Sequence, residues 1–230
     1  MAIDVKICGI TNTNDLVAAV ASGAAYLGFV FYPPSPRNVD ISRWKQLASG
    51  SPSTVPRVGV MVDPEDRWID EILETAPLDY IQLHGRETPG RTSAIRERSG
   101  VRIIKAIPVR NADDVDRHRD YLDCADMILF DAKPPATAGA IPGGNGISFD
   151  WRLLAGHPIG LPWILAGGLD ADNVAEAVRL TGASTIDASS RIESEPGLKN
   201  HTEMKRLLTR ASTLVRGETR ETEVVPHDSD

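Results

Sequence analysis

Cysteine is scarce in this chain, which has only two among its 230 residues. Two thiols cannot form the disulfide framework that staples a small secreted domain. The sequence also has no CxxC motif, no HExxH motif and no cluster of cysteine with histidine. Because metal sites in proteins are usually built from such clusters, we expect no metal site.

Long apolar runs are missing as well. No stretch approaches the roughly 20 apolar residues that cross a bilayer. The first residues, MAIDVKICGI, lack the basic and apolar regions of a secretion signal. The formal net charge of −7 disfavours binding to nucleic acid or to an anionic membrane through the overall field. We therefore expect a cytoplasmic protein with no nucleic-acid or membrane partner.

What the chain does contain is one repeated unit, a short β-rich apolar run followed by a segment with helical patterning. The apolar runs fall at residues 5–10, 25–32, 56–62, 79–84, 101–109, 126–132, 162–168 and 184–189. Strands that alternate with helices imply crossover connections and a parallel sheet. Eight units predict a single-domain (β/α)8 TIM barrel over residues 1–216, with the polar residues 217–230 as a disordered tail.

An open, doubly wound sheet is the alternative to the barrel. That fold usually places a glycine-rich GxGxxG turn after its first strand, and CGITNTND is not such a turn. In a barrel, active sites lie at the carboxyl ends of the strands, on the loops that follow them. Polar residues cluster there in this chain: Cys8, Arg37, Gln82, His84, Lys105, Asp131, Asp187 and Ser189. Strand alternation puts Lys6 on the same face as Cys8.

The ends of the last two strands suggest a phosphate site. Gly167 and Gly168 follow the seventh strand, and Ser189 and Ser190 follow the eighth. Barrels often bind phosphate with these two loops, where glycines let backbone N–H groups approach an anion. An ordinary turn is the other explanation. The long loop KPPATAGAIPGGNGIS after the sixth strand is either slack or a lid over the ligand, and we favour the lid.

Taken together, these motifs resemble the phosphoribosylanthranilate isomerase family, barrel enzymes of tryptophan biosynthesis. The resemblance rests on VKICGIT, GFVFYPPSPR, QLHG, FDAKPP, GGNG with FDW, ILAGGL with DNV, and DASS with a downstream ES-PG-LK segment. It implies an Amadori rearrangement of N-(5-phosphoribosyl)anthranilate to its 1-deoxyribulose phosphate isomer, with no cofactor and no metal. The implied partner is this small phosphorylated substrate, and the protein is expected to be a monomer or a homodimer.

The resemblance also implies roles for individual residues. Cys8 would be the general base, Asp131 the general acid, and Arg37 would hold the anthranilate carboxylate bidentately. The substrate phosphate would lie against Gly167, Gly168, Ser189 and Ser190. We further expect Gln82, His84 and Asp187 to contact substrate, although His84 could equally be a hydrogen-bonded strand-end residue.

The chemistry adds two hypotheses. To act as an acid, Asp131 must be held protonated, by burial or by a like charge such as Asp187. To act as a base, Cys8 must lose its proton, and a free thiol has a pKa of about 8.5. Lys6, on the same strand face, is therefore expected to lower the pKa of Cys8.

The chain departs from the family pattern after the eighth strand, where the family usually has SSG and this chain has SSR. Arg191 could contact the phosphate, obstruct it, or point to solvent. Asn145 is a milder departure in the expected lid. One rival function is the related isomerase of the histidine pathway, which uses an aspartate where this chain has Cys8. The other is a catalytically weakened barrel that only binds.

Overall fold

The computed structural model describes residues 2–133, 143–144 and 146–214. The predicted tail, most of the expected lid and Asn145 lie outside these residues. Eight parallel strands close into a barrel in chain order, and β1 pairs with β8. They are β1 (Asp4–Cys8), β2 (Tyr26–Val30), β3 (Arg57–Met61), β4 (Tyr80–Leu83), β5 (Arg102–Val109), β6 (Met127–Ala132), β7 (Trp163–Leu165) and β8 (Thr185–Ala188). The predicted (β/α)8 barrel is confirmed.

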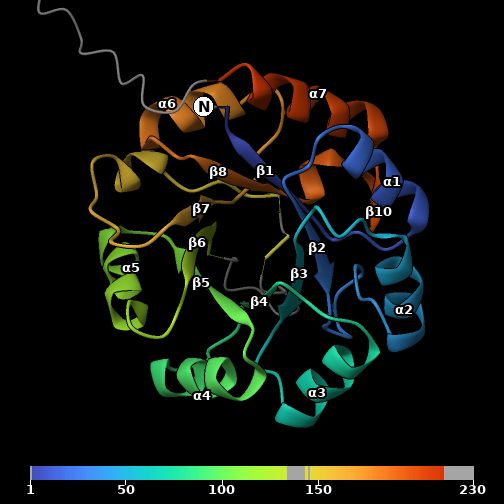
Figure 1. Cartoon of the computed structure of the whole chain (residues 1–230). Coiled ribbons are helices and arrows are strands. Elements are labelled where there is room, and N and C mark those ends of the chain that lie inside the picture. Colours follow the sequence, from blue (N-terminus) through green and yellow to red (C-terminus); the bar gives the residue numbers. More distant parts are fainter. Residues whose placement is uncertain (1, 134–142, 145, 215–230) are drawn as a thin grey trace, which may run out of the picture.

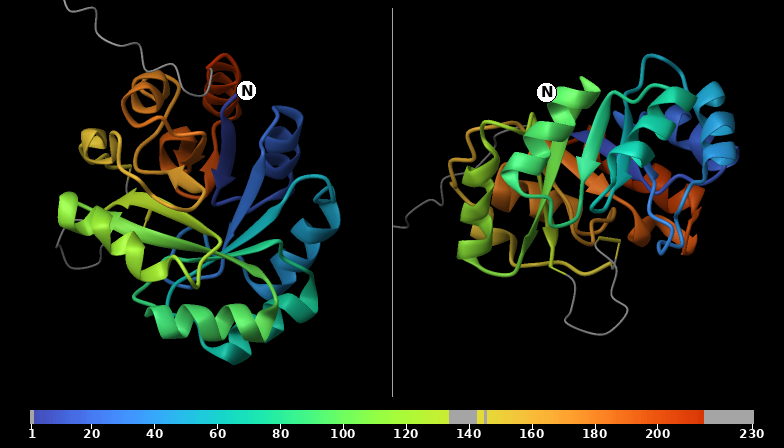
Figure 2. Two further views of the ribbon diagram at one scale, coloured as in Figure 1. Left: turned by 60° about the vertical axis from the view of Figure 1, so that its left-hand side comes forward. Right: turned by 90° about the horizontal axis from the view of Figure 1, so that it is seen from below.

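Helices form a ring outside the strands (Figures 1 and 2). The α-helices are α1 (Thr13–Ala21), α2 (Ile41–Gly50), α3 (Asp66–Thr75), α4 (Pro89–Ser99), α5 (Ala112–Asp116), α6 (Val174–Thr181) and α7 (His201–Ser212). Three 3-10 helices accompany them: η1 (Arg117–Tyr121), η2 (Trp151–Leu154) and η3 (Ser190–Ile192). A small antiparallel hairpin, β9 (Glu193–Glu195) and β10 (Leu198–Lys199), follows β8. No helix among the described residues has the length and hydrophobicity needed to cross a membrane.

Local sequence signals explain where several helices begin and end. Asn12 caps α1 by accepting a hydrogen bond from the Asp15 N–H at 2.9 Å. Gly100 and Gly182 end α4 and α6 in the left-handed conformation, at φ of +65° and +71°. The segment after the expected lid forms the short 3-10 helix η2.

The strands bury both of their faces, and the described residues form three hydrophobic clusters. The largest cluster lies between the strands and the helices, where Trp44 packs against Phe29 and Phe31 at ring distances of 5.0 and 5.5 Å. A second cluster fills the barrel interior: Val58, Tyr80, Ile104, Ala106, Met127, Leu129, Ile164 and Ala166. Cys8, Val30 and Val60 form a third, smaller cluster. The filled interior leaves the carboxyl ends of the strands as the place for chemistry.

Candidate active site

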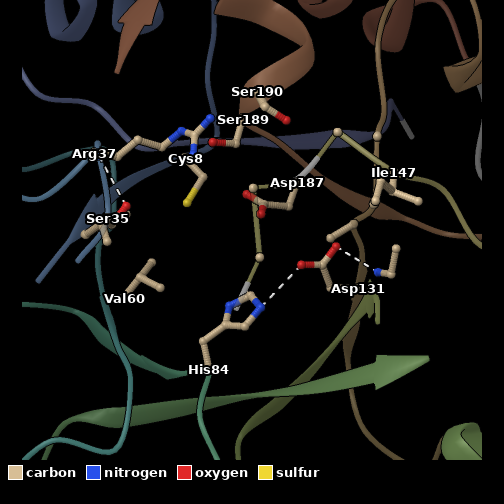
Figure 3. A pocket seen from close by; sticks show the side chains of 18 of the residues that line it. Cys8, Ser35, Arg37, Val60, His84, Asp131, Ile147, Asp187, Ser189 and Ser190 are labelled. Carbon is tan, nitrogen blue, oxygen red and sulfur yellow. Dashed lines mark hydrogen bonds and ion pairs between the residues drawn. The ribbon is translucent and has the colours of Figure 1, made fainter. Parts of the chain in front are cut away.

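A pocket lies at the carboxyl ends of the strands (Figure 3). Its lining includes every residue that the sequence predicts for the site: Cys8, Arg37, Gln82, His84, Asp131, Gly167, Gly168, Asp187, Ser189, Ser190 and Arg191. These residues come from β1, β4, β6 and β8 and from the loops after β2, β4, β7 and β8. Barrel closure therefore brings together groups that are up to 183 positions apart in the chain, from residue 8 to residue 191.

Cys8 lies beside a buried ion pair. Lys6 is fully buried and shares its strand face with Cys8, as alternation predicts. The Lys6 Nζ donates to Asp187 Oδ1 at 2.8 Å, and the two residues are direct partners in the β1–β8 pairing. Gly28 leaves the space for this arrangement, because a Cβ there would lie 3.0 Å from Cys8 Sγ and 3.1 Å from Lys6 Nζ. A thiol, an ammonium and a carboxylate thus share one small volume.

The pKa of Cys8 is set by burial and by the two charged groups beside it. Burial raises the pKa of the Cys8 thiol above its ordinary value, the charge of Lys6 lowers it, and Asp187 raises it again. The prediction that Lys6 lowers the pKa of Cys8 is therefore confirmed, but Lys6 does not outweigh burial, and the net pKa of the thiol is raised. Burial lowers the pKa of Lys6 itself, yet Asp187 and Cys8 raise it more, to about 12, so the ammonium stays charged.

Asp131 lies at the end of β6 and is held from two sides (Figure 3). Its Oδ1 accepts the backbone N–H of Ala132 at 2.8 Å, and its Oδ2 lies 3.3 Å from His84 Nε2. The His84 Nδ1 is in turn 2.9 Å from Gln82 Nε2. With the amide nitrogen of Gln82 as donor, Nδ1 accepts and the proton of His84 sits on Nε2, facing Asp131. The like charge invoked for Asp131, Asp187, is itself paired with Lys6.

Arg37 reaches the pocket from the loop after β2, but one edge of its guanidinium is already occupied. Its Nε donates to Glu193 Oε1 at 2.9 Å, and its Nη2 donates to Glu193 Oε2 at 2.6 Å. Both side chains are buried, with 7% and 4% of their surfaces exposed. Glu193 also accepts from Lys199 Nζ at 2.7 Å. Although burial raises the pKa of Glu193, hydrogen bonds and charge from these two cations hold it below its ordinary value.

Gly167 and Gly168 lie where the β6 and β7 loops meet. Both have left-handed backbones, with φ of +93° and +63°. A Cβ on Gly168 would lie 2.7 Å from Ser148 Oγ and 3.0 Å from the Gly146 carbonyl oxygen. Ser148 also donates to the Gly167 carbonyl at 3.2 Å. Conformation and close approach therefore both require glycine at these two positions.

Arg191 follows Ser189 and Ser190, and its side chain contacts residues of two other loops. Its Nε donates to the Gly146 carbonyl at 3.1 Å, and its Nη1 lies 3.5 Å from Asp170 Oδ2. The side chain is about half exposed. Among the described residues, Asp63 is the only non-glycine with a positive φ, so Arg191 does not strain the backbone where the family usually has glycine. Its guanidinium lies at the rim of the pocket, against the end of the β6 loop.

One pair of charged residues beside Arg37 was not predicted for the site. Glu193 and Lys199 lie in the ES-PG-LK segment, which supported the resemblance but suggested no role. The strand-end Lys105 faces away from the pocket: its Nζ donates to Glu87 Oε2 at 2.7 Å and to the Gly85 carbonyl at 3.0 Å. Within the described ranges, no set of three or more His, Cys, Asp or Glu side chains is arranged to hold a metal ion.

Comparison with known sequences points to one family. The family model for PRAI, N-(5′-phosphoribosyl)anthranilate (PRA) isomerase, matches residues 5–210. The chain is similar to the N-(5′-phosphoribosyl)anthranilate isomerase of Paracoccus denitrificans, with 50% identity over 215 residues that cover 94% of this chain and 100% of the relative. The enzyme of the same name from Paramagnetospirillum magneticum is 48% identical over 211 residues, covering 92% and 98%.

Solved structures agree with the sequences. A phosphoribosylanthranilate isomerase from Thermotoga maritima superposes with a TM-score of 0.82 at 35% identity, covering 92% of this chain and 100% of that one. Another, in complex with reduced 1-(o-carboxyphenylamino)-1-deoxyribulose 5-phosphate, gives a TM-score of 0.80 at 34% identity with the same coverage. This chain therefore belongs to the N-(5′-phosphoribosyl)anthranilate isomerase family.

Proposed function

We propose that Asp131 is the general acid and Cys8 the general base of this isomerase, which rearranges N-(5′-phosphoribosyl)anthranilate to 1-(2-carboxyphenylamino)-1-deoxyribulose 5-phosphate in tryptophan biosynthesis. The observation that carries the proposal is that both groups line one pocket, from β1 and β6. A thiol and a carboxyl group on separate strands can act on two different atoms of one bound sugar.

The reaction needs two proton transfers at the sugar. Asp131 gives its proton to the ring oxygen as the bond between that oxygen and C1 breaks, which opens the ring and leaves a Schiff base between C1 and the anthranilate nitrogen. Cys8, as thiolate, then takes the proton on C2, and the electron pair of the C–H bond moves into the conjugated system. The resulting enolamine becomes the ketone by moving the hydroxyl proton on C2 to C1.

The residues around Cys8 affect the fraction of the thiol that is present as thiolate. Because burial raises the pKa of the thiol, only a small fraction is thiolate at neutral pH. The Lys6 ammonium stabilises that fraction, and Asp187 holds the ammonium in place at 2.8 Å. The pair thus supports the charged form of the base inside a pocket that otherwise disfavours it.

The two ends of the substrate are bound by different chemistry. We propose that the phosphate binds at the backbone N–H groups of Gly167 and Gly168 and at Ser189 and Ser190. Arg191 adds a positive charge at the rim. Arg37 lies beside Ser189 in the pocket (Figure 3) and receives the anthranilate carboxylate, since guanidinium binds planar carboxylates well.

Three further polar residues line the same pocket. We propose that Gln82, His84 and Asp187 contact the ribose portion, with His84 also orienting Asp131 at 3.3 Å. We also propose a cytoplasmic location, and a monomer or a homodimer in solution. In support of the latter, one similar structure is described as monomers generated from a dimeric enzyme of Thermotoga maritima.

One assay tests the catalytic roles. The loss of phosphoribosylanthranilate fluorescence is followed for the wild type and for the Cys8→Ala and Asp131→Asn variants. General acid and base groups contribute about 10²- to 10⁴-fold, so each variant should lose at least about a hundredfold in kcat. Circular dichroism confirms that the variants are folded. Wild-type rates in both folded variants would refute the assignment, and an inactive wild type would favour a barrel that only binds.

A further inference from the structure

The contact between Arg37 and Glu193 joins two loops that lie 156 positions apart in the chain. Glu193 begins β9, and Lys199, its register partner, ends β10. The turn of this hairpin is held against the loop that carries Arg37. A Cβ on Gly197 would lie 2.9 Å from the Pro36 carbonyl oxygen, and Thr11 Oγ1 donates to the Gly197 carbonyl at 2.6 Å. The backbones on both sides of the contact are therefore fixed.

The Glu193 carboxylate accepts three hydrogen bonds from two cationic side chains. It takes two parallel hydrogen bonds from Arg37, and Oε1 takes a third from Lys199 Nζ at 2.7 Å. The Lys199 side chain is fully buried and also donates to the Ser189 carbonyl at 3.2 Å. The three charges sum to +1, since two cations surround one anion. This group, Arg37, Glu193 and Lys199, is called the Arg37 triad below.

The triad leaves a defined part of Arg37 for a ligand. A guanidinium has five N–H donors in a rigid fork. Glu193 uses Nε–H and one N–H of Nη2, so both N–H groups of Nη1 and the second N–H of Nη2 remain. One N–H of Nη1 and the second N–H of Nη2 lie side by side along one edge and can still bind a carboxylate with two hydrogen bonds. That edge faces Gly144, where a Cβ would lie 2.6 Å from Nη1, so a side chain there would block it.

We propose that Glu193 is a positioning residue, which locks the plane of Arg37 so that its free edge meets the carboxylate of the substrate's aromatic ring. This inference rests on the role proposed above for Arg37. A long, flexible arginine loses rotamer freedom when it binds, and a preformed bidentate partner removes that cost before the substrate arrives. Glu193 would then set the preference for substrates that carry the carboxylate.

The alternative role for Glu193 is to neutralise charge. The matched variants separate the two because they change geometry and charge independently. Glu193→Gln with Lys199→Met keeps the net charge of the triad at +1 but removes the bidentate partner of Arg37. Lys199→Met alone lowers the net charge to 0 and keeps that partner. Both substitutions replace a buried side chain with one of similar length.

The measurement is inhibition of the reaction by two probes. One is the product, 1-(2-carboxyphenylamino)-1-deoxyribulose 5-phosphate, and the other is its phenylamino analogue without the carboxylate. The inhibition constant of the analogue divided by that of the product reports how well the carboxylate is recognised. A hydrogen bond to a charged group contributes about 1.5–3 kcal/mol, so the double variant should lose about tenfold or more of this ratio. Lys199→Met alone should keep the ratio within about twofold.

The outcomes are distinct. A general structural defect would weaken both probes equally and leave the ratio unchanged, which would overturn the positioning role. A higher ratio in the double variant would show that Glu193 competes with the ligand instead of orienting Arg37, which also overturns it. Arg37→Met tests the role on which the inference rests. If Arg37→Met keeps the ratio, the assignment of Arg37 is wrong. If Arg37→Met lowers the ratio and the double variant leaves it unchanged, only the role of Glu193 is wrong.

Discussion

Replacing Lys6 with methionine should make Cys8 much less reactive towards an alkylating reagent. In the folded protein Lys6 is fully buried, lies on the Cys8 face of β1 and donates to Asp187 at 2.8 Å. The substitution removes the cation that lowers the pKa of Cys8. It also leaves Asp187, which raises that pKa, without its charge partner. Both changes disfavour the thiolate.

The magnitude follows from the charges. Two unit charges about 4 Å apart interact by about 4 kcal/mol at an effective dielectric constant of about 20. Losing even about a third of that stabilisation lowers the thiolate fraction about tenfold, because a factor of ten corresponds to about 1.4 kcal/mol. We therefore expect the alkylation rate of Lys6→Met at pH 8 to fall at least about tenfold.

The assay needs a background in which one thiol reacts. The chain has two free cysteines, Cys8 and Cys124, so Cys124→Ala leaves Cys8 as the sole target. Iodoacetamide labelling is followed by mass spectrometry from pH 6 to pH 10. Breaking a buried ion pair can cost about 3–5 kcal/mol, so urea unfolding must show that the Lys6→Met protein remains folded.

A third variant makes the prediction sharper. Lys6→Met with Asp187→Asn removes both charges, so the uncompensated carboxylate disappears along with the ammonium. Since Lys6 influences the Cys8 pKa more than Asp187 does, the rates at pH 8 should fall in the order wild type, double variant, Lys6→Met. An unchanged pH profile in the folded Lys6→Met protein would refute the reasoning.

Two further predictions concern the proposed phosphate site, and a third concerns the stability that Glu193 provides. Gly168→Ala should raise KM for the phosphorylated substrate about tenfold and weaken inhibition by inorganic phosphate by a similar factor. The reason is that the Gly168 backbone is left-handed and that a Cβ there would lie 2.7 Å from Ser148 Oγ. An unchanged KM would contradict this prediction. Arg191→Gly should raise the same KM if Arg191 binds the phosphate, whereas a lower KM would show that it obstructs. In the folded protein, Arg37 and Lys199 lower the pKa of Glu193 despite its burial. The Glu193 carboxylate therefore contributes its full stabilisation above its unfolded pKa of about 4.3, and this stabilisation is lost as the pH falls through the folded pKa. Urea midpoints measured from pH 7 to pH 3 should therefore fall less steeply for Glu193→Gln than for the wild type, and parallel curves would contradict the ion pairing.

Much of the fold follows from local patterns. Eight apolar runs alternate with helical segments, and each run contains or overlaps an observed strand. The period of two along a strand is enough to place Lys6 with Cys8 and Gln82 with His84. The members of each pair are observed close together on the same side of the chain. Because parallel strands present their carboxyl ends at one rim, the residues after the strands could be assigned to a common pocket.

The same patterns fail where the outcome depends on distant partners. Lys105 follows the strand-end rule, yet it points outward to Glu87, since parity within β5 sends its side chain to the helix layer. The (β/α)8 repeat predicts a full helix between β6 and β7, but the described residues there form only the 3-10 helix η2. Glu193 lies beyond the last strand of the barrel, in a segment without periodicity, and only the hairpin brings it to Arg37.

The sequence by itself therefore determined the barrel, the rim on which the site lies and the residue types gathered there, because these depend on short-range periodicity and on the chemistry of side chains. The tertiary structure decided how those groups are charged and oriented. Closing the barrel places Lys6 opposite Asp187, 181 positions away, and the hairpin after β8 gives Arg37 its carboxylate partner. The pKa of Cys8 is likewise a balance between burial and two opposed charges. Each of these depends on distances that form only when β1 pairs with β8 and the hairpin after β8 folds against the β2 loop.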